Sequence, residues 1–154
     1  ARDISASDWR DYVFGYACLL DMVVRGREER VFRKAFDSFC PVGPWIVTAD
    51  EVADPSALNM RLWVNDDLRQ SANTRDLVLD IPGMVEMAAA VMTLHPGDII
   101  ATGTPAGVGP VRDGDVIRIA IDEVGEMSVP VRQGRSGHTP VFDTPYTPDI
   151  VKQH

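Results

Sequence analysis

The chain has 154 residues, of which 23 are acidic and 15 basic, so its formal net charge is −8. This charge argues against a nucleic-acid-binding surface, which needs clustered lysine and arginine, and no apolar run approaches the ~18 residues of a membrane-spanning helix. The length supports one core and one domain, and the 45% hydrophobic content excludes a disordered chain.

The first third of the chain is expected to hold one short helix and two strands. Residues 5–11 suit a short helix, because Ser5 and Asp8 have the spacing of a capping box. Residues 12–22 are apolar and predict a buried strand that ends at Asp21. A charged connection over 25–34 and an irregular, proline-stiffened segment over 36–44 then lead to a short strand at 45–48.

The remaining elements predict a sheet around one helix. Residues 58–64 alternate as a half-buried strand does, and a turn at 65–67 leads into a second strand at 68–70. Residues 84–94 predict a helix that is apolar nearly all round and therefore buried. Strands follow at 99–102, 116–121 and 126–131, and 134–154 reads as an extended C-terminal arm. The predicted fold class is a β-rich α+β domain with one buried helix.

Two cysteines, Cys18 and Cys40, lie far apart without a C-x-x-C motif. Reduced thiols in a cytoplasmic protein are favoured over a disulfide, although the spacing leaves the disulfide open.

A glycine-rich segment, Thr102-Gly-Thr-Pro-Ala-Gly-Val-Gly109, follows a predicted strand. A dinucleotide loop needs G-x-G-x-x-G running into a helix, whereas this segment has a different glycine order and leads to a turn and a strand. A strand end that presents threonine hydroxyls and backbone N–H groups to a small oxyanion is better supported than nucleotide binding. From the residues alone, a tight turn without a ligand is slightly favoured.

Two charged residues stand out because of their neighbours. Asp21 ends an apolar run, so its carboxylate must be paired or must coordinate a cation, and a salt bridge to Arg25 or Arg27 is the commoner outcome. Lys34 precedes the proline-stiffened segment, where its ammonium can pair with a carboxylate or an enolate oxygen. A solvated lysine is the commoner alternative.

The order of these segments resembles the fumarylacetoacetate hydrolase family. The resemblance covers roughly residues 12–131, and several ordered motifs are more specific than any one of them. The motifs are Tyr12-Val-Phe-Gly-Tyr, Leu20-Asp-Met, Lys34-Ala-Phe-Asp-Ser-Phe-Cys-Pro-Val-Gly-Pro-Trp, Leu68-Arg-Gln-Ser-Ala-Asn-Thr, Thr93-Leu-His-Pro-Gly-Asp and the glycine-rich segment.

This resemblance implies a fold, a cofactor and a substrate class. The family's catalytic domain is a mixed β-roll that binds a divalent ion, Mg²⁺ or Mn²⁺. Its members act on small 2-oxo or β-diketo acids, and many hydrolyse a C–C bond in an acylpyruvate during aromatic-compound catabolism. Others isomerise, hydrate or decarboxylate related 2-oxo-dienoic acids. Homodimers are usual, and neither a nucleic-acid nor a membrane partner is expected.

The resemblance also implies roles for four residues. Asp21 matches the metal-binding aspartate, and Lys34 matches the catalytic lysine near the metal. Thr104 and Arg25 match residues that bind the substrate, and the threonine binds the carboxylate group of the substrate. Gln70 lies in a family motif without an assigned role.

Some expected features have no counterpart in the chain. The family's two further metal ligands form a Glu-x-Glu pair upstream of the Tyr-Val-Phe-Gly-Tyr motif, and residues 1–11 contain no glutamate. We therefore expect residues 1–154 to be a single catalytic domain that lacks its N-terminal strands. The alternative is a non-catalytic family fold that has lost its metal site.

Overall fold

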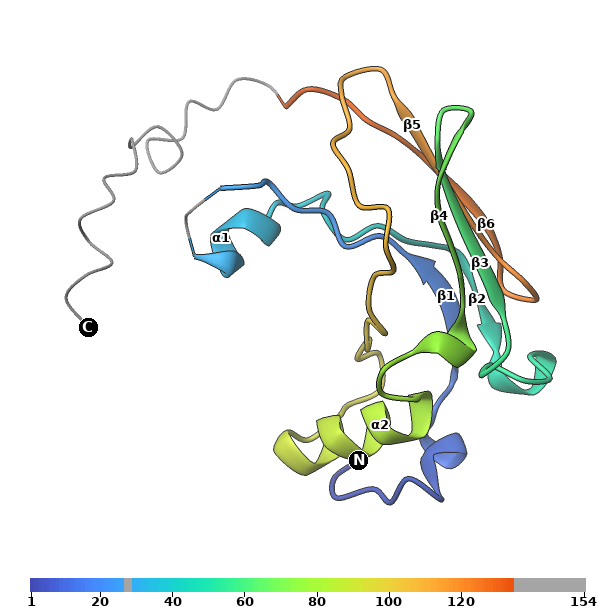
Figure 1. Ribbon diagram of the computed structural model, residues 1–154. Helices are drawn as coiled ribbons and strands as arrows, with labels where there is room; N and C mark the ends of the chain where they lie inside the picture. The colour runs from blue at the N-terminus through green and yellow to red at the C-terminus, as the bar shows by residue number, and fades with distance from the viewer. Residues whose placement is uncertain (27–28, 135–154) are drawn as a thin grey trace.

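The computed structural model describes residues 1–26 and 29–134, and Figure 1 shows their arrangement. The predicted arm at 134–154 lies almost entirely outside the described residues. The elements follow in the order η1 (Trp9–Tyr12), β1 (Gly15–Leu19), α1 (Arg30–Lys34), β2 (Val42–Thr48), η2 (Ala49–Glu51), β3 (Asn59–Val64), β4 (Asp67–Asn73), η3 (Thr74–Asp76), α2 (Ile81–Val91), β5 (Val116–Ile121) and β6 (Gly125–Pro130).

The strands form two sheets, and every pairing among the described residues is antiparallel. One sheet has two strands, β1 and β2, and the other has four in the order β4-β3-β5-β6. The two sheets contact each other through β1 and β2 on one side and β5 and β6 on the other. The predicted β-rich α+β class is confirmed. None of the helices in the described residues has the length and apolar character that crossing a membrane requires.

The larger core lies between the two sheets. It is built from alternating positions of the strands and from the connections beside them, namely Cys18, Leu20, Val52, Leu58, Ile117, Ile119, Val124 and Met127. On β5 the intervening residue, Arg118, faces outward. Its Cζ atom lies 3.8 Å from the centre of the Trp63 ring, and its Nη1 atom pairs with Oε2 of Glu126 at 3.0 Å. The alternation that predicted a strand at 116–121 therefore separates the core face from the solvent face.

A smaller core joins the N-terminal segment to α2. Val85 and Ala89, one turn apart on α2, pack against Ile4 and Trp9. The helix begins earlier than predicted because Asp80 caps it, its carboxylate accepting a hydrogen bond from Gly83 N at 2.9 Å. The expectation that this helix is buried all round is wrong, since Met87, Val91 and Met92 are exposed.

Three other local predictions differ from the structure. The helix expected at 5–11 is replaced by the shorter η1, because Asp8 makes no side-chain cap and instead closes a backbone turn with Ser5. The charged connection expected at 25–34 contains α1, a helix of five residues that local hydrogen bonds are enough to form. The strand expected at 99–102 is absent, because this segment pairs with no other strand.

Replacing Ile119 by alanine is expected to destabilise the protein by about 2–5 kcal/mol, the usual range for a buried isoleucine. Ile119 is 2% exposed within the larger core, so its removal leaves a cavity between the two sheets. Urea unfolding of the complete gene product measures the change. The matched control is Val116→Ala on the same strand, where the side chain is 42% exposed and the loss should stay below about 1 kcal/mol. Equal losses in the two variants would contradict this placement of the core.

Candidate active site

The structure brings Asp21 and Lys34 together through backbone pairing beyond β1. Leu20 N donates to Pro41 O at 3.1 Å and Met22 N donates to Phe39 O at 2.8 Å, so the chain around Asp21 stays extended after β1 ends. A further bond, from Val24 N to Arg33 O at 3.0 Å, ties the same segment to α1. As a result, the Nζ atom of Lys34 donates to Oδ2 of Asp21.

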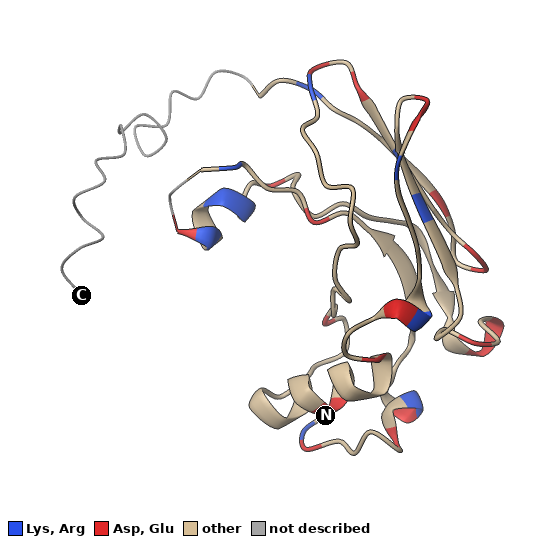
Figure 2. Ribbon diagram, in the orientation of Figure 1, with Lys and Arg blue, Asp and Glu red and all other residues tan. Residues whose placement is uncertain are grey.

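This ion pair is accessible to solvent. Both side chains are 38% exposed, so the pair adds little to the stability of the fold and a ligand can reach it. The second carboxylate oxygen of Asp21, Oδ1, has no hydrogen-bond partner among the described residues. Figure 2 shows that basic residues gather on α1, which places positive charge around Lys34.

The other two predicted site residues do not join the pair. Arg25 is exposed, and in the described part of the chain it makes no ion pair with Asp21. Asp21 pairs with Lys34 instead of Arg25. The other partner that spacing favoured, Arg27, lies outside the described residues. Thr104 is exposed within the irregular 99–110 segment and forms no hydrogen bond to Asp21 or Lys34.

The segment that carries Thr104 rests on β4. The Nε2 atom of Gln70 donates to Pro105 O at 3.4 Å. At Gly107, where φ is +101°, a Cβ atom would lie 1.8 Å from Arg69 O, so only glycine permits this approach. Sequence reasoning gave Gln70 no role, although a polar residue at a core-facing position of a strand was the available signal.

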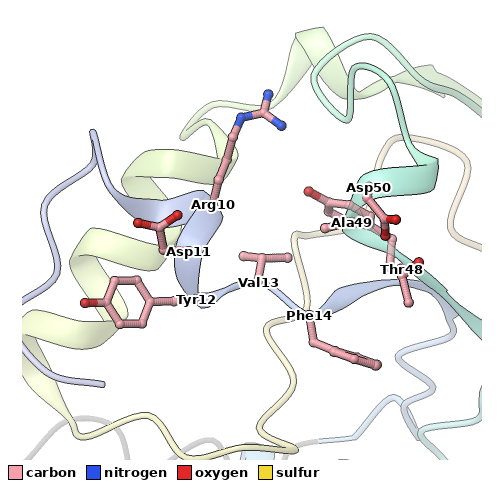
Figure 3. A pocket seen from close by; sticks show the side chains of 9 residues that line it. Arg10, Asp11, Tyr12, Val13, Phe14, Thr48, Ala49 and Asp50 are labelled. Carbon is pink, nitrogen blue, oxygen red and sulfur yellow. The ribbon is translucent and has the colours of Figure 1, made fainter.

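A cavity of about 630 Å³ opens elsewhere, at the start of β1, and contains none of the four predicted site residues. Figure 3 shows that the charged groups of Arg10 and Asp11 extend away from each other, so they do not converge on one ligand. Binding sites combine apolar walls with convergent polar groups, and this cavity lacks the second feature. Its lining is Arg10, Asp11, Tyr12, Val13, Phe14, Tyr16, Thr48, Ala49 and Asp50.

The buried Cys18 is not arranged as a nucleophile. Burial raises the pKa of the Cys18 thiol, and the negative charge of Glu126 adds to the increase, so this thiol stays protonated at neutral pH. Cys18 and Cys40 are both free, as the composition favoured.

The family model described as "Fumarylacetoacetate (FAA) hydrolase C-terminal" matches residues 1–132. The chain belongs to the fumarylacetoacetate hydrolase family. The predicted resemblance and the β-rich fold are thereby confirmed.

Relatives within the fumarylacetoacetate hydrolase family include enzymes with different reactions. The chain is 48% identical over 132 residues to maleylpyruvate hydrolase of Aquipseudomonas alcaligenes, an alignment that covers 86% of this chain and 46% of the relative. Thus the chain spans about half the length of the curated relatives it matches.

Two solved structures extend the comparison. Maleylpyruvate hydrolase from Sphingobium sp. SYK-6, in complex with manganese(II) and pyruvate, is 74% identical with a TM-score of 0.84, covering 88% of this chain and 50% of that one. A 2-hydroxyhepta-2,4-diene-1,7-dioate isomerase from Mycobacterium marinum is 43% identical with a TM-score of 0.82, and the match covers 88% of this chain and 54% of that one.

A metal ion is implied by the fumarylacetoacetate hydrolase family, and the described residues fit one position of such a site. Asp21 offers a free carboxylate oxygen of the type that hard divalent cations prefer. However, no three histidine, cysteine, aspartate or glutamate side chains gather as a metal site within 1–26 and 29–134. These residues therefore do not form a complete metal site.

Proposed function

We propose that the protein hydrolyses a carbon–carbon bond in a small acylpyruvate, with maleylpyruvate as the first candidate substrate. The observation that carries the proposal is the 74% identity to a maleylpyruvate hydrolase, over 88% of this chain. The exposed Asp21–Lys34 pair supplies reactive groups of the type that such a reaction needs.

The proposed reaction has a defined flow of electrons. Water adds to the acyl carbonyl next to the pyruvyl methylene, and the bond between these two carbons then breaks. Its electron pair passes to the methylene carbon and is delocalised onto the 2-oxo oxygen as an enolate. Protonation of the carbon releases pyruvate, and the acyl fragment leaves as a second carboxylic acid.

Lys34 is proposed to stabilise the enolate oxygen. Its ammonium is held at the C-terminal end of α1 by Asp21, so it is fixed before the substrate arrives. A positive charge placed in advance beside a developing oxyanion lowers the barrier without reorganisation. In the same proposal, Thr104 binds the substrate carboxylate and Arg25 adds a second positive charge.

Asp21 is proposed to be one ligand of a divalent metal, Mg²⁺ or Mn²⁺, with the remaining ligands outside the described residues. The solved relative with manganese and pyruvate supports this proposal, as does the free oxygen of Asp21. Such an ion would act as a Lewis acid toward the substrate. A homodimer in the cytoplasm is the proposed form of the protein.

Isomerisation or decarboxylation of a 2-oxo-dienoic acid is the second candidate function. The observation that favours it is the 43% identity to a 2-hydroxyhepta-2,4-diene-1,7-dioate isomerase with a similar fold. The lower identity places this reaction behind hydrolysis.

A substrate panel tests the proposal. The complete gene product is incubated with Mn²⁺ and maleylpyruvate, fumarylpyruvate, acetylpyruvate or a 2-hydroxy-2,4-dienedioate, and products are identified by chromatography. We expect pyruvate and the matching acid in equal amounts from maleylpyruvate. An isomer or CO₂ without pyruvate would favour the second function, and no conversion of any acid would favour a non-catalytic family member.

A further inference from the structure

Gln70 differs from every other side chain in the described residues because it is polar and buried, at 7% exposed. It lies on β4 between the exposed residues Arg69 and Ser71, so its carboxamide points to the inner face of the sheet. Burying an amide without a hydrogen bond is unfavourable by roughly 1–3 kcal/mol. The buried carboxamide of Gln70 therefore needs a hydrogen-bond partner in the folded chain.

The hydrogen bond of Gln70 reaches the residue next to Thr104. Its Nε2 atom donates to Pro105 O, and in the described residues this is the one hydrogen bond of the carboxamide. Proline has no backbone N–H, so its carbonyl is the single backbone group through which Pro105 can be held. The bond therefore fixes the backbone within one residue of the proposed substrate-binding hydroxyl.

Two glycines show how closely the same loop approaches β4. Gly107 lies against the backbone of Arg69, and a Cβ atom added there would also come within 3.2 Å of Cγ of Gln70. At Gly109, an added Cβ atom would lie 2.8 Å from Nη1 of Arg69. The loop thus follows the strand closely from Pro105 to Gly109, and the Gln70 hydrogen bond lies at the end nearest Thr104.

We propose that Gln70 is a positioning residue, which holds the 103–109 loop on β4 through the carbonyl of Pro105 and thereby sets Thr104 for binding of the substrate carboxylate. This inference rests on the proposed function for the identity of the substrate. The placement of the loop rests on contacts that do not depend on the proposed function. Gln70 acts through Thr104 and needs no contact with the substrate.

Two substitutions remove the hydrogen bond while keeping the shape of the side chain. Gln70→Met is similar in length and apolar, and Gln70→Glu is isosteric but cannot donate when ionised. In the complete gene product, both variants should raise KM for maleylpyruvate about tenfold, the effect of losing one net hydrogen bond, with kcat changed less than about threefold. Hydrogen exchange of the peptide covering 103–109 should become faster in both.

The two variants should separate as the pH falls. Protonation of the carboxylate introduced by Gln70→Glu restores a donor toward Pro105 O, and burial brings this protonation to a higher pH than for an exposed glutamate. KM of Gln70→Glu should therefore approach that of the wild type at low pH, whereas KM of Gln70→Met stays raised. Such a recovery would assign the rise in KM to the lost hydrogen bond to Pro105 and not to altered packing of the side chain. Gln133→Met, at an exposed position after β6, is the control and should leave KM unchanged.

Two outcomes would overturn the inference. Unchanged KM and unchanged exchange at 103–109 in both variants would overturn it. Faster exchange along the whole chain, with kcat falling together with the folded fraction, would also overturn it in favour of a general structural role. If the wild type converts no acid, the hydrolase proposal fails. The Gln70 inference is then decided by the exchange rates and by pyruvate binding measured by calorimetry.

Discussion

Replacing Lys34 by methionine is expected to reduce kcat for maleylpyruvate by about 10²- to 10³-fold, the usual effect of removing one preorganised group from an oxyanion. Methionine is unbranched and one atom shorter than lysine, and it removes the ammonium that Asp21 holds at the end of α1. The pair is partly exposed, so its loss should change the free energy of unfolding by no more than about 1 kcal/mol. Steady-state kinetics and urea unfolding of the complete gene product measure both quantities.

The control for this prediction lies on the same short helix. Arg30→Met removes a positive charge from the exposed start of α1 and should leave kcat within about twofold of the wild type, because a solvated charge there is screened. Turnover that is equal in the wild type and Lys34→Met would contradict the proposed role of Lys34. A similar loss in both variants would mean that the general charge of α1 is responsible.

Replacing Asp21 by asparagine is expected to weaken Mn²⁺ binding by about 100-fold or more. Even the mutation of residues that only hydrogen-bond to the metal ligands lowers metal affinity by about 10- to 100-fold. The amide oxygen keeps the shape of the ligand but lacks the negative charge that a hard divalent cation prefers. Calorimetric titration of the complete gene product with Mn²⁺ measures the affinity.

Asp37→Asn is the matched control for Asp21→Asn. Asp37 lies on the segment between α1 and β2, is exposed, and makes no ion pair among the described residues. Its substitution should leave the Mn²⁺ affinity unchanged. If Asp21→Asn also binds Mn²⁺ as tightly as the wild type, Asp21 is not a ligand.

Strands with clear alternation were the part of the fold that the sequence predicted best. The expected strand at 116–121 coincides with β5, because its buried isoleucines alternate with Arg118 on the solvent face. The predicted hairpin of β3 and β4 is present, and β4 runs beyond Gln70 to Asn73. Patterns of this kind follow from the two faces of a strand, so they need no knowledge of distant partners.

Elements that depend on distant contacts were predicted less well. The apolar residues at 99–102 were expected to form a strand, but the structure leaves them unpaired. Similarly, the apolar sequence of α2 did not show that only the face of Val85 and Ala89 is covered. In each case the outcome depends on which neighbour is available, and spacing along the chain does not encode that information.

The candidate site shows the same division. Asp21 and Lys34 were each singled out from their neighbours and from the order of motifs, and the structure then paired them. Their pairing depends on the backbone contacts of 20–22 with 39–41, which join segments that the sequence leaves apart. Gln70 escaped assignment because its burial and its contact with Pro105 exist only in the folded chain.

The most direct measurement of the central claim is a crystal structure of the complete gene product grown with Mn²⁺ and pyruvate. We predict a metal ion with a carboxylate oxygen of Asp21 about 2 Å away. We also predict pyruvate between that ion, Nζ of Lys34 and the hydroxyl of Thr104. A manganese ion bound elsewhere, with Asp21 still paired only to Lys34, would contradict the claim that this pair is the reaction centre.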